Sequence, residues 1–172
     1  MFSKDVTIEG EILAKDWKVN MSKDVKLNTL LAQAGVKKDE TTGALTTPLH
    51  FSTTYQHPEF GQSTGYDYTR TKNPTRVSLE ETLAAIESAD YALATSSGMS
   101  AIVLAFSAFP VGSKVLAVRD LYGGSFRWFA QAEAEGRFAF TYANTEEELL
   151  NNLTEDIDIV YIETPTNPLM VE

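Results

Sequence analysis

A polar loop at residues 96–99 has the composition of a phosphate-binding site. The segment Ser96-Ser97-Gly98-Met99 stands between two apolar stretches, and the second of them is typical of a helix. Glycine lets a ligand approach the backbone closely, and the free N–H groups at the start of a helix favour an anion such as phosphate. Serine also caps helices without binding any ligand, which is the plainer alternative for this loop.

Two more loops could complete a site for a planar, anionic ligand. Tyr122 precedes the glycine pair at 123–124, so its ring could stack on a planar molecule beside a bound phosphate. Asn167 lies between two prolines, which would present its side-chain amide rigidly. Taken alone, a tyrosine at a strand edge and an asparagine in a turn are the ordinary interpretations.

An irregular segment at residues 41–72 carries a further candidate. It is rich in Thr, Ser, Gly and Pro, and it ends with Tyr68 and Arg70. A guanidinium group can bind phosphate through two parallel hydrogen bonds, although an exposed arginine that pairs with a nearby glutamate is the plainer interpretation. Irregular segments of this length are uncommon inside compact domains and tend to be functional.

Several other chemistries have no support in the sequence. There is no cysteine, which excludes disulfides, thiolate zinc sites and cysteine nucleophiles. His50 and His57 lie in the irregular segment without the helical spacing of a zinc protease, so we interpret them as ordinary loop residues. Neither a glycine-rich nucleotide motif nor a Gly-x-Ser-x-Gly elbow occurs. We therefore predict no metal site.

The charge of the chain is acidic and uneven. The 172 residues include 24 acidic and 14 basic ones, for a formal net charge of −10, and residues 138–172 hold eight acidic residues and no basic one. Nucleic acid requires a positive face, and no apolar run approaches the roughly 18 residues of a membrane span. The amino-terminal residues do not resemble a secretory signal. We therefore expect a cytoplasmic protein without a nucleic-acid or membrane partner.

The elements that must position these loops alternate between helix and strand. Apolar periodicity and capping residues predict helices at 27–35, 74–87, 99–109, 122–135 and 145–153. Short apolar segments predict strands at 91–95, 114–118, 138–142 and 157–162. This alternation indicates an α/β fold with a mostly parallel sheet, whose ligands bind at the carboxyl ends of the strands. The helix at 99–109 is almost wholly apolar, so we expect a larger assembly to cover it on every side.

Four motifs together resemble one family of enzymes. They are YTRTKNPTR at 68–76, SSGMSA at 96–101, DLYGGS at 120–125 and ETPTNP at 163–168. In this order they are similar to motifs of the Cys/Met-metabolism family of pyridoxal-phosphate (transsulfuration) enzymes, over about residues 24–172. The resemblance implies the type I, aspartate-aminotransferase-like fold and a homotetramer built from tight dimers.

The resemblance also implies pyridoxal 5′-phosphate as the cofactor and a role for each loop. The backbone N–H groups of Gly98 and Met99 would hold the phosphate of the cofactor. The ring of Tyr122 would stack on the pyridine ring, and Asn167 would contact the 3′-oxygen.

The domain organisation follows from the same resemblance. Residues 1–20 would be an extension before a second plausible start, and residues 21–76 an N-terminal arm with a dimer-interface loop. Tyr68 and Arg70 of this loop would reach the cofactor phosphate of the neighbouring subunit. Residues 77–172 would be the first, incomplete part of the cofactor-binding large domain.

The resemblance further implies that the sequence is an N-terminal fragment. The family's Schiff-base lysine, its pyridinium-binding aspartate and its substrate-carboxylate arginine all lie beyond the position of Glu172, and neither Lys72 nor Lys114 matches the lysine. Because this lysine is both the cofactor's anchor and a proton carrier, we expect the fragment alone to be inactive. Turnover by the purified 172-residue chain above that of free pyridoxal phosphate would contradict this expectation.

The activity implied for the complete protein is transsulfuration in methionine and cysteine biosynthesis. The first interpretation is the γ-replacement of the cystathionine γ-synthase branch, which forms cystathionine from an O-acylhomoserine and cysteine. Cleavage of a C–S bond, as in cystathionine β-lyase or γ-lyase, is the main alternative. A non-catalytic, phosphate-binding remnant and a generic nucleotide or phosphate binder are the others.

Overall fold

The computed structural model describes residues 26–36 and 39–171. By their internal contacts, these residues separate into two compact units that divide between Ala94 and Thr95. Each unit is described by itself. The extension expected at residues 1–20 lies outside the described residues, and the division of the chain at residue 76 stays a prediction.

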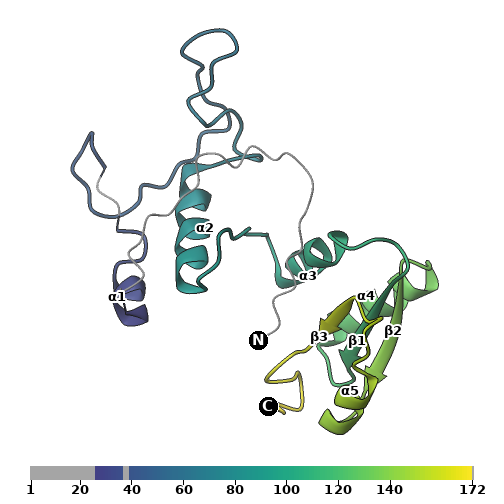
Figure 1. Ribbon diagram of the computed structural model, residues 1–172. Helices are drawn as coiled ribbons and strands as arrows, with labels where there is room; N and C mark the ends of the chain where they lie inside the picture. The colour runs from purple at the N-terminus through teal and green to yellow at the C-terminus, as the bar shows by residue number, and fades with distance from the viewer. Residues whose placement is uncertain (1–25, 37–38, 172) are drawn as a thin grey trace. The chain divides into compact units, whose positions relative to one another are not determined.

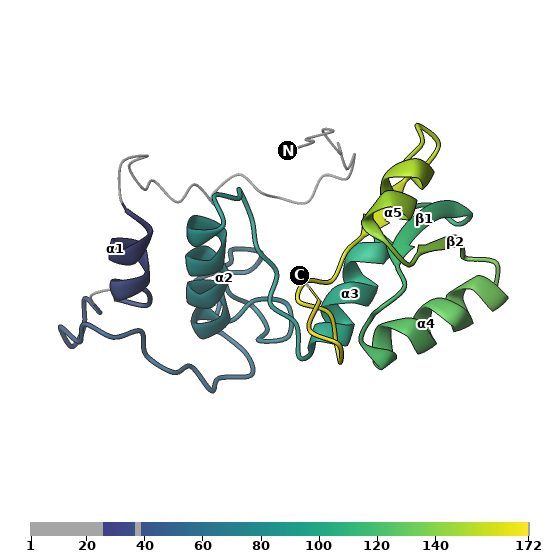
Figure 2. The ribbon, with the colours of Figure 1, turned by 90° about the horizontal axis from the view of Figure 1, so that it is seen from below.

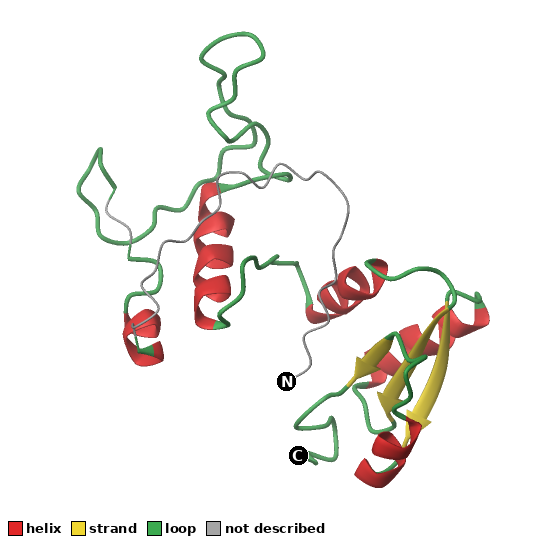
Figure 3. Ribbon diagram, viewed as in Figure 1, coloured by secondary structure: helices red, strands yellow, loops and turns green. Residues whose placement is uncertain are grey.

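Two helices frame the first unit. α1 (Leu27–Ala32) packs against α2 (Pro74–Ile86), and the described residues between them form a long loop (Figures 1 and 3). The Asn73 side chain accepts hydrogen bonds from the N–H groups of Thr75 (2.9 Å) and Arg76 (3.4 Å). Because a proline takes the next position, where no N–H donor is needed, α2 begins where the sequence predicts it.

The irregular segment before α2 contains no helix or strand, as the sequence predicts. Two backbone hydrogen bonds close it into a loop: the N–H of Thr69 donates to the carbonyl of Thr53 (2.9 Å), and the N–H of Tyr55 donates to the carbonyl of Asp67 (3.1 Å). Tyr68 therefore lies at the closed base of this loop rather than at its free tip.

The second unit consists of three helices and a three-stranded sheet. In chain order, its elements are α3 (Gly98–Ser107), β1 (Ser113–Val118), α4 (Gly123–Ala134), β2 (Phe138–Ala143), α5 (Glu146–Asn152) and β3 (Ile159–Tyr161). β1 is central and parallel to both neighbours, with Val115 opposite Phe140 on one side and Ile159 on the other. The predicted α/β fold with a parallel sheet is confirmed.

An aromatic core fills the space between one face of the sheet and the helices α3 and α4. The ring of Phe129 lies 5.1 Å from that of Phe106 and stacks on Phe140 at 4.6 Å between centroids. Val115 of β1 points into the same core, whereas the buried Leu116 points to the opposite face, where α5 lies (Figure 2). Helices thus cover both faces of β1 and fix the strand ends from which the candidate loops leave.

The strand predicted at residues 91–95 does not form. Tyr91 and Leu93 are exposed, and no strand of the described residues pairs with this segment. An extended segment becomes a strand only when a neighbour supplies hydrogen-bond partners, and here the N–H of Ala94 donates to the carboxylate of Glu80 instead. The prediction was wrong because apolar composition indicates burial but does not identify a pairing partner.

The apolar helix α3 is covered on one face within the second unit. Phe106 is buried in the aromatic core, whereas the side chain of Leu104 is 43% exposed. An apolar helix face is stable in contact with other apolar groups and not with water. Coverage of the second face by a larger assembly stays a prediction.

An exposed ion pair links the start of β1 to the turn before β3, and it predicts a pH dependence. Lys114 Nζ lies 2.5 Å from Asp156 Oδ2, and this contact, with a hydrogen bond from Thr154, lowers the pKa of Asp156 from 3.8 to about 2. A carboxylate whose pKa falls on folding stabilises the fold above its unfolded pKa and loses that contribution as the pH falls through its folded pKa. We therefore expect the melting temperature of Asp156→Asn to be below that of the wild type at pH 6, and the gap to close between pH 4 and pH 2.

Thermal unfolding followed by circular dichroism at several pH values measures this gap. Glu155→Gln removes the same charge from the neighbouring residue and is the matched control. The difference in melting temperature should be small because the ion pair is exposed. The test is therefore whether this difference disappears at low pH, and not how large it is. A gap that stays constant down to pH 2 would show that the ion pair does not stabilise the fold.

Candidate functional site

The loop before α3 presents two free N–H groups at the start of a helix. The Ser97 side chain accepts a hydrogen bond from the N–H of Ser100 (3.1 Å), and its carbonyl accepts from the N–H of Ala101 (3.1 Å). The N–H groups of Gly98 and Met99 precede these donors, and among the described residues they have no acceptor. A Cβ built on Gly98 would have no atom within 4 Å, so the space beside it is open. Ser97 can therefore cap α3 while the N–H groups of Gly98 and Met99 remain available to an anion.

Tyr122 is held by a carboxylate from the end of the neighbouring strand. Its N–H donates to both carboxylate oxygens of Glu163, at 3.1 and 3.2 Å, while its side chain stays exposed. Glu163 follows β3, and Tyr122 follows β1, which lies beside β3 in the sheet. The hydrogen bonds therefore join the loops at two adjacent carboxyl ends. Sequence analysis placed Glu163 in a motif but gave it no role.

Glycine at position 124 makes room for the Tyr122 ring. A Cβ on Gly124 would clash with Cε1 of the Tyr122 ring, because it would come closer than real Cβ contacts do. A Cβ on Gly123 would meet only the end of the Arg127 side chain, at 3.4 Å. The two glycines thus differ, because only the second one accommodates the aromatic ring.

Asn167 lies on an exposed turn of a loop that is anchored by its neighbour. Thr166 is buried, its N–H donates to the carbonyl of Val171 (2.9 Å), and its hydroxyl accepts from the N–H of Val171 (2.9 Å). Asn167 itself is exposed. The loop after β3 therefore has a fixed base and presents the Asn167 amide to solvent.

A buried serine connects the loops of the second unit. Ser125, in the first turn of α4, is fully buried, and its hydroxyl contacts Met99 Sδ at 3.9 Å and the Tyr161 hydroxyl at 3.5 Å. The first turns of α3 and α4 are thus held together against β3. The structure brings the three predicted loops, which contain Gly98, Tyr122 and Asn167, to the carboxyl end of one sheet, the expected position of a ligand.

Among the residues of these three loops, only backbone N–H groups favour an anion. The loops contain two carboxylates, Asp120 and Glu163, and neither lysine nor arginine. Positive potential comes from the first N–H groups of α3 and from Arg127 of α4, whose guanidinium end lies beside Gly123. A cation from another segment would therefore strengthen the binding of a phosphate considerably.

Tyr68 and Arg70 belong to the first unit, where they contact each other. The guanidinium carbon of Arg70 lies 5.3 Å from the centroid of the Tyr68 ring. Arg70 is exposed, and no carboxylate of the described residues pairs with it, which disfavours the interpretation as a surface ion pair. Arg70 is thus an accessible cation on a loop with a closed base.

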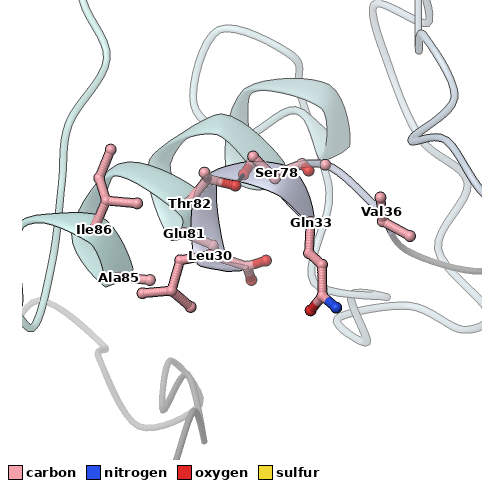
Figure 4. Close-up of a pocket in the computed structure, with 10 residues that line it drawn as sticks. Leu30, Gln33, Val36, Ser78, Glu81, Thr82, Ala85 and Ile86 are labelled. Atoms are coloured by element: carbon pink, nitrogen blue, oxygen red, sulfur yellow. Dashed lines mark hydrogen bonds between the residues drawn. The ribbon is translucent and has the colours of Figure 1, made fainter. Parts of the chain in front are cut away.

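A hollow lies in the first unit, between α1 and α2. It measures about 460 Å³, and it is lined by Leu30 and Gln33 on one side and by Ser78, Thr82 and Ile86 on the other (Figure 4). None of the residues predicted to bind a cofactor lines it.

His57 pairs with Asp67 at 2.8 Å in an exposed loop, and the described residues include no cluster of three or more potential metal ligands. No helix in the described part of the chain is long and apolar enough to cross a membrane.

The fit of the Tyr122 ring over Gly124 gives a prediction that separates function from stability. Gly124→Ala should displace the ring. If the ring stacks on pyridoxal phosphate, as the resemblance implies, the variant should bind this cofactor about three- to tenfold more weakly, the value of one aromatic contact. The melting temperature should change little, because the Tyr122 side chain is exposed and can move. Fluorescence titration with the cofactor measures the binding. Gly123→Ala is the matched control, and equal losses in both variants would contradict the stacking role of the Tyr122 ring.

The sequence and the fold are both similar to known proteins. Residues 28–172 match the family described as Cys/Met metabolism PLP-dependent enzyme. The chain is 42% identical over 148 residues to a cystathionine γ-synthase/O-acetylhomoserine (thiol)-lyase of Bacillus subtilis, with 85% of this chain and 40% of the relative covered. It is 38% identical over 148 residues to a cystathionine γ-lyase of the same organism, with 85% and 39% covered.

A solved structure with a similar fold is that of cystathionine γ-synthase from Xanthomonas oryzae pv. oryzae in complex with cystathionine. The TM-score is 0.79 at 37% sequence identity, and the match covers 86% of this chain and 39% of that one. The chain thus spans about 40% of the length of these relatives.

Proposed function

Because the chain belongs to the family of Cys/Met metabolism PLP-dependent enzymes, whose cofactor is pyridoxal 5′-phosphate, we propose that the protein carries out γ-replacement in transsulfuration. Cysteine would attack Cγ of an O-acylhomoserine, so that a Cγ–S bond forms, the Cγ–O bond breaks and the acyl group leaves as a carboxylate. The relatives named above include a cystathionine γ-synthase/thiol-lyase and a γ-lyase, and the name of the relative with the higher identity supports replacement over cleavage.

One observation on this chain's own residues supports pyridoxal phosphate as its cofactor. Two N–H groups without acceptors, an exposed ring and an exposed amide gather at the carboxyl end of the sheet. Donors for the phosphate, a ring for stacking and an amide for a ring substituent are the groups that a phosphorylated aromatic molecule requires. The residues present therefore fit pyridoxal phosphate, which supplies an electron sink when it is bound.

Each residue of the second unit has a proposed task in binding. The N–H groups of Gly98 and Met99 would hold the phosphate, aided by the dipole of α3. The Tyr122 ring, positioned by Glu163, would stack on the pyridine ring and exclude water from one of its faces. Asn167 would orient the ring through its 3′-oxygen.

The remaining charge would come from a second copy of the chain. We propose that Tyr68 and Arg70 contact the cofactor phosphate of the neighbouring subunit in a homotetramer of tight dimers. The lack of any lysine or arginine in the three loops supports this, because the dianionic phosphate needs a cation. The absence of a carboxylate partner for Arg70 among the described residues supports it as well.

Product analysis on the purified protein tests the proposal. Because the 172 residues alone are expected to be inactive, the assay needs a protein that also carries the family's Schiff-base lysine. With that protein, cystathionine should form from an O-acylhomoserine plus cysteine in the presence of pyridoxal phosphate, and pyruvate from cystathionine would indicate a β-lyase instead. Retention of pyridoxal phosphate without turnover of either substrate would favour a non-catalytic remnant. Displacement of pyridoxal phosphate by a nucleotide would favour a generic phosphate binder.

A further inference from the structure

Arg76 of α2 binds the backbone on both sides of Arg70. Its guanidinium donates to the carbonyl of Thr69 at 3.2 Å and to the carbonyl of Thr71 at 2.8 Å. Both carbonyls belong to the residues that flank Arg70 in the sequence. A single guanidinium fork thus fixes the backbone that carries the proposed phosphate-binding arginine.

The partner of Arg76 is a buried carboxylate with a second task. Glu80, one turn further along α2, is only 8% exposed, and its Oε1 lies 3.4 Å from Nε of Arg76. The same oxygen accepts a hydrogen bond from the N–H of Ala94 at 3.0 Å. Ala94 ends the first unit and stands two residues before Ser96, where the proposed phosphate loop begins.

The burial of Glu80 separates this pair from ordinary pairs at helix surfaces. An exposed i,i+4 pair contributes little, whereas a buried carboxylate is tolerated only when donors satisfy it. Here the donors are Arg76 and the Ala94 backbone, so loss of either leaves a buried charge incompletely satisfied. The two contacts are therefore coupled through one carboxyl group.

We propose that Arg76 and Glu80 are positioning residues that couple the two phosphate-binding segments of one chain. Through Arg76, the carboxylate orders the backbone around Arg70, which is directed at a neighbouring subunit. Through Ala94, it orders the segment that leads into the Gly98 loop of its own subunit. The inference rests on the proposed function, because the phosphate-binding roles of Arg70 and Gly98 are part of that proposal.

Amide hydrogen exchange on the 172-residue chain, read by mass spectrometry, tests the coupling. Glu80→Ala removes the acceptor for both donors, so exchange should become faster by about tenfold in peptides covering both 68–73 and 92–96. Glu80→Gln keeps an acceptor for Ala94 but loses the charge that holds Arg76. It should accelerate exchange in 68–73 and leave 92–96 near the wild type.

The matched control is Glu87→Gln, which removes one charge from the exposed end of α2. A change confined to one segment in Glu80→Ala, or a Glu80→Gln pattern equal to that of Glu87→Gln, would overturn the coupling. If Glu80→Ala does not fold, the nearly isosteric Glu80→Gln variant still decides, because a merely structural role would not separate the two segments.

Titration of the same variants with pyridoxal phosphate separates this inference from the function on which it rests. A wild-type protein that binds no pyridoxal phosphate would refute the proposed function, whereas the exchange pattern would still decide the coupling. If both hold, Glu80→Ala should bind the cofactor at least several-fold more weakly than Glu87→Gln. Equal affinities of these two variants would overturn the positioning role.

Discussion

Replacing Phe129 by alanine should lower the free energy of unfolding by about 3–5 kcal/mol. Phe129 has no exposed surface, and its ring contacts Phe106, Phe140 and Tyr161 at centroid distances of 4.6–5.1 Å. Because α3, α4, β2 and β3 all meet this side chain, they cannot collapse into the cavity without losing other contacts. The lost transfer energy and the cavity energy therefore add.

Urea denaturation followed by far-ultraviolet circular dichroism measures this loss. Phe126→Ala removes the same atoms from the same helix at a position that is 39% exposed, and it should cost less than about 1 kcal/mol. Equal losses in the two variants would show that the aromatic core does not hold the second unit together.

The local elements were predictable from the sequence because their signals are local. Asn73 followed by a proline fixes the start of α2, because a helix cap depends only on residues that are neighbours in the sequence. The loops at 96–99 and 120–125 could be predicted as site segments for a similar reason. Each contains glycine at the start of a helix, which already implies exposed N–H groups.

Long-range contacts explain what the sequence analysis missed. Glu163 acts on Tyr122 across 41 residues, and only the pairing of β1 with β3 makes that contact predictable. From the sequence alone, Glu80 would be placed on the exposed face of a helix. Only the fold shows that Ala94 contacts its carboxylate. The segment at 91–95 had the composition of a strand, but composition cannot supply the second strand that a ladder requires.

Replacing Arg70 by alanine should weaken pyridoxal phosphate binding about 10- to 100-fold. This range corresponds to the loss of hydrogen bonds between a charged donor and a charged acceptor, about 1.5–3 kcal/mol. The loss should be large because the loops around Gly98 and Tyr122 contribute no cationic side chain of their own. Arg70→Lys should recover only part of the affinity, since an ammonium group cannot form the two parallel bonds of a guanidinium.

Arg119 provides a matched control for this effect. Its guanidinium carbon lies 5.3 Å from the Tyr142 ring, the same distance that separates Arg70 from Tyr68, and 5.6 Å from the Phe126 ring. Arg119→Ala therefore removes an equal charge and at least an equal ring contact. Fluorescence titration of both variants with pyridoxal phosphate compares them directly. Equal weakening would mean that the loss of any one positive charge weakens the binding of the cofactor, so that Arg70 has no specific role. Weakening by Arg70→Ala alone means that the phosphate requires this guanidinium, which the irregular segment holds at the base of its closed loop.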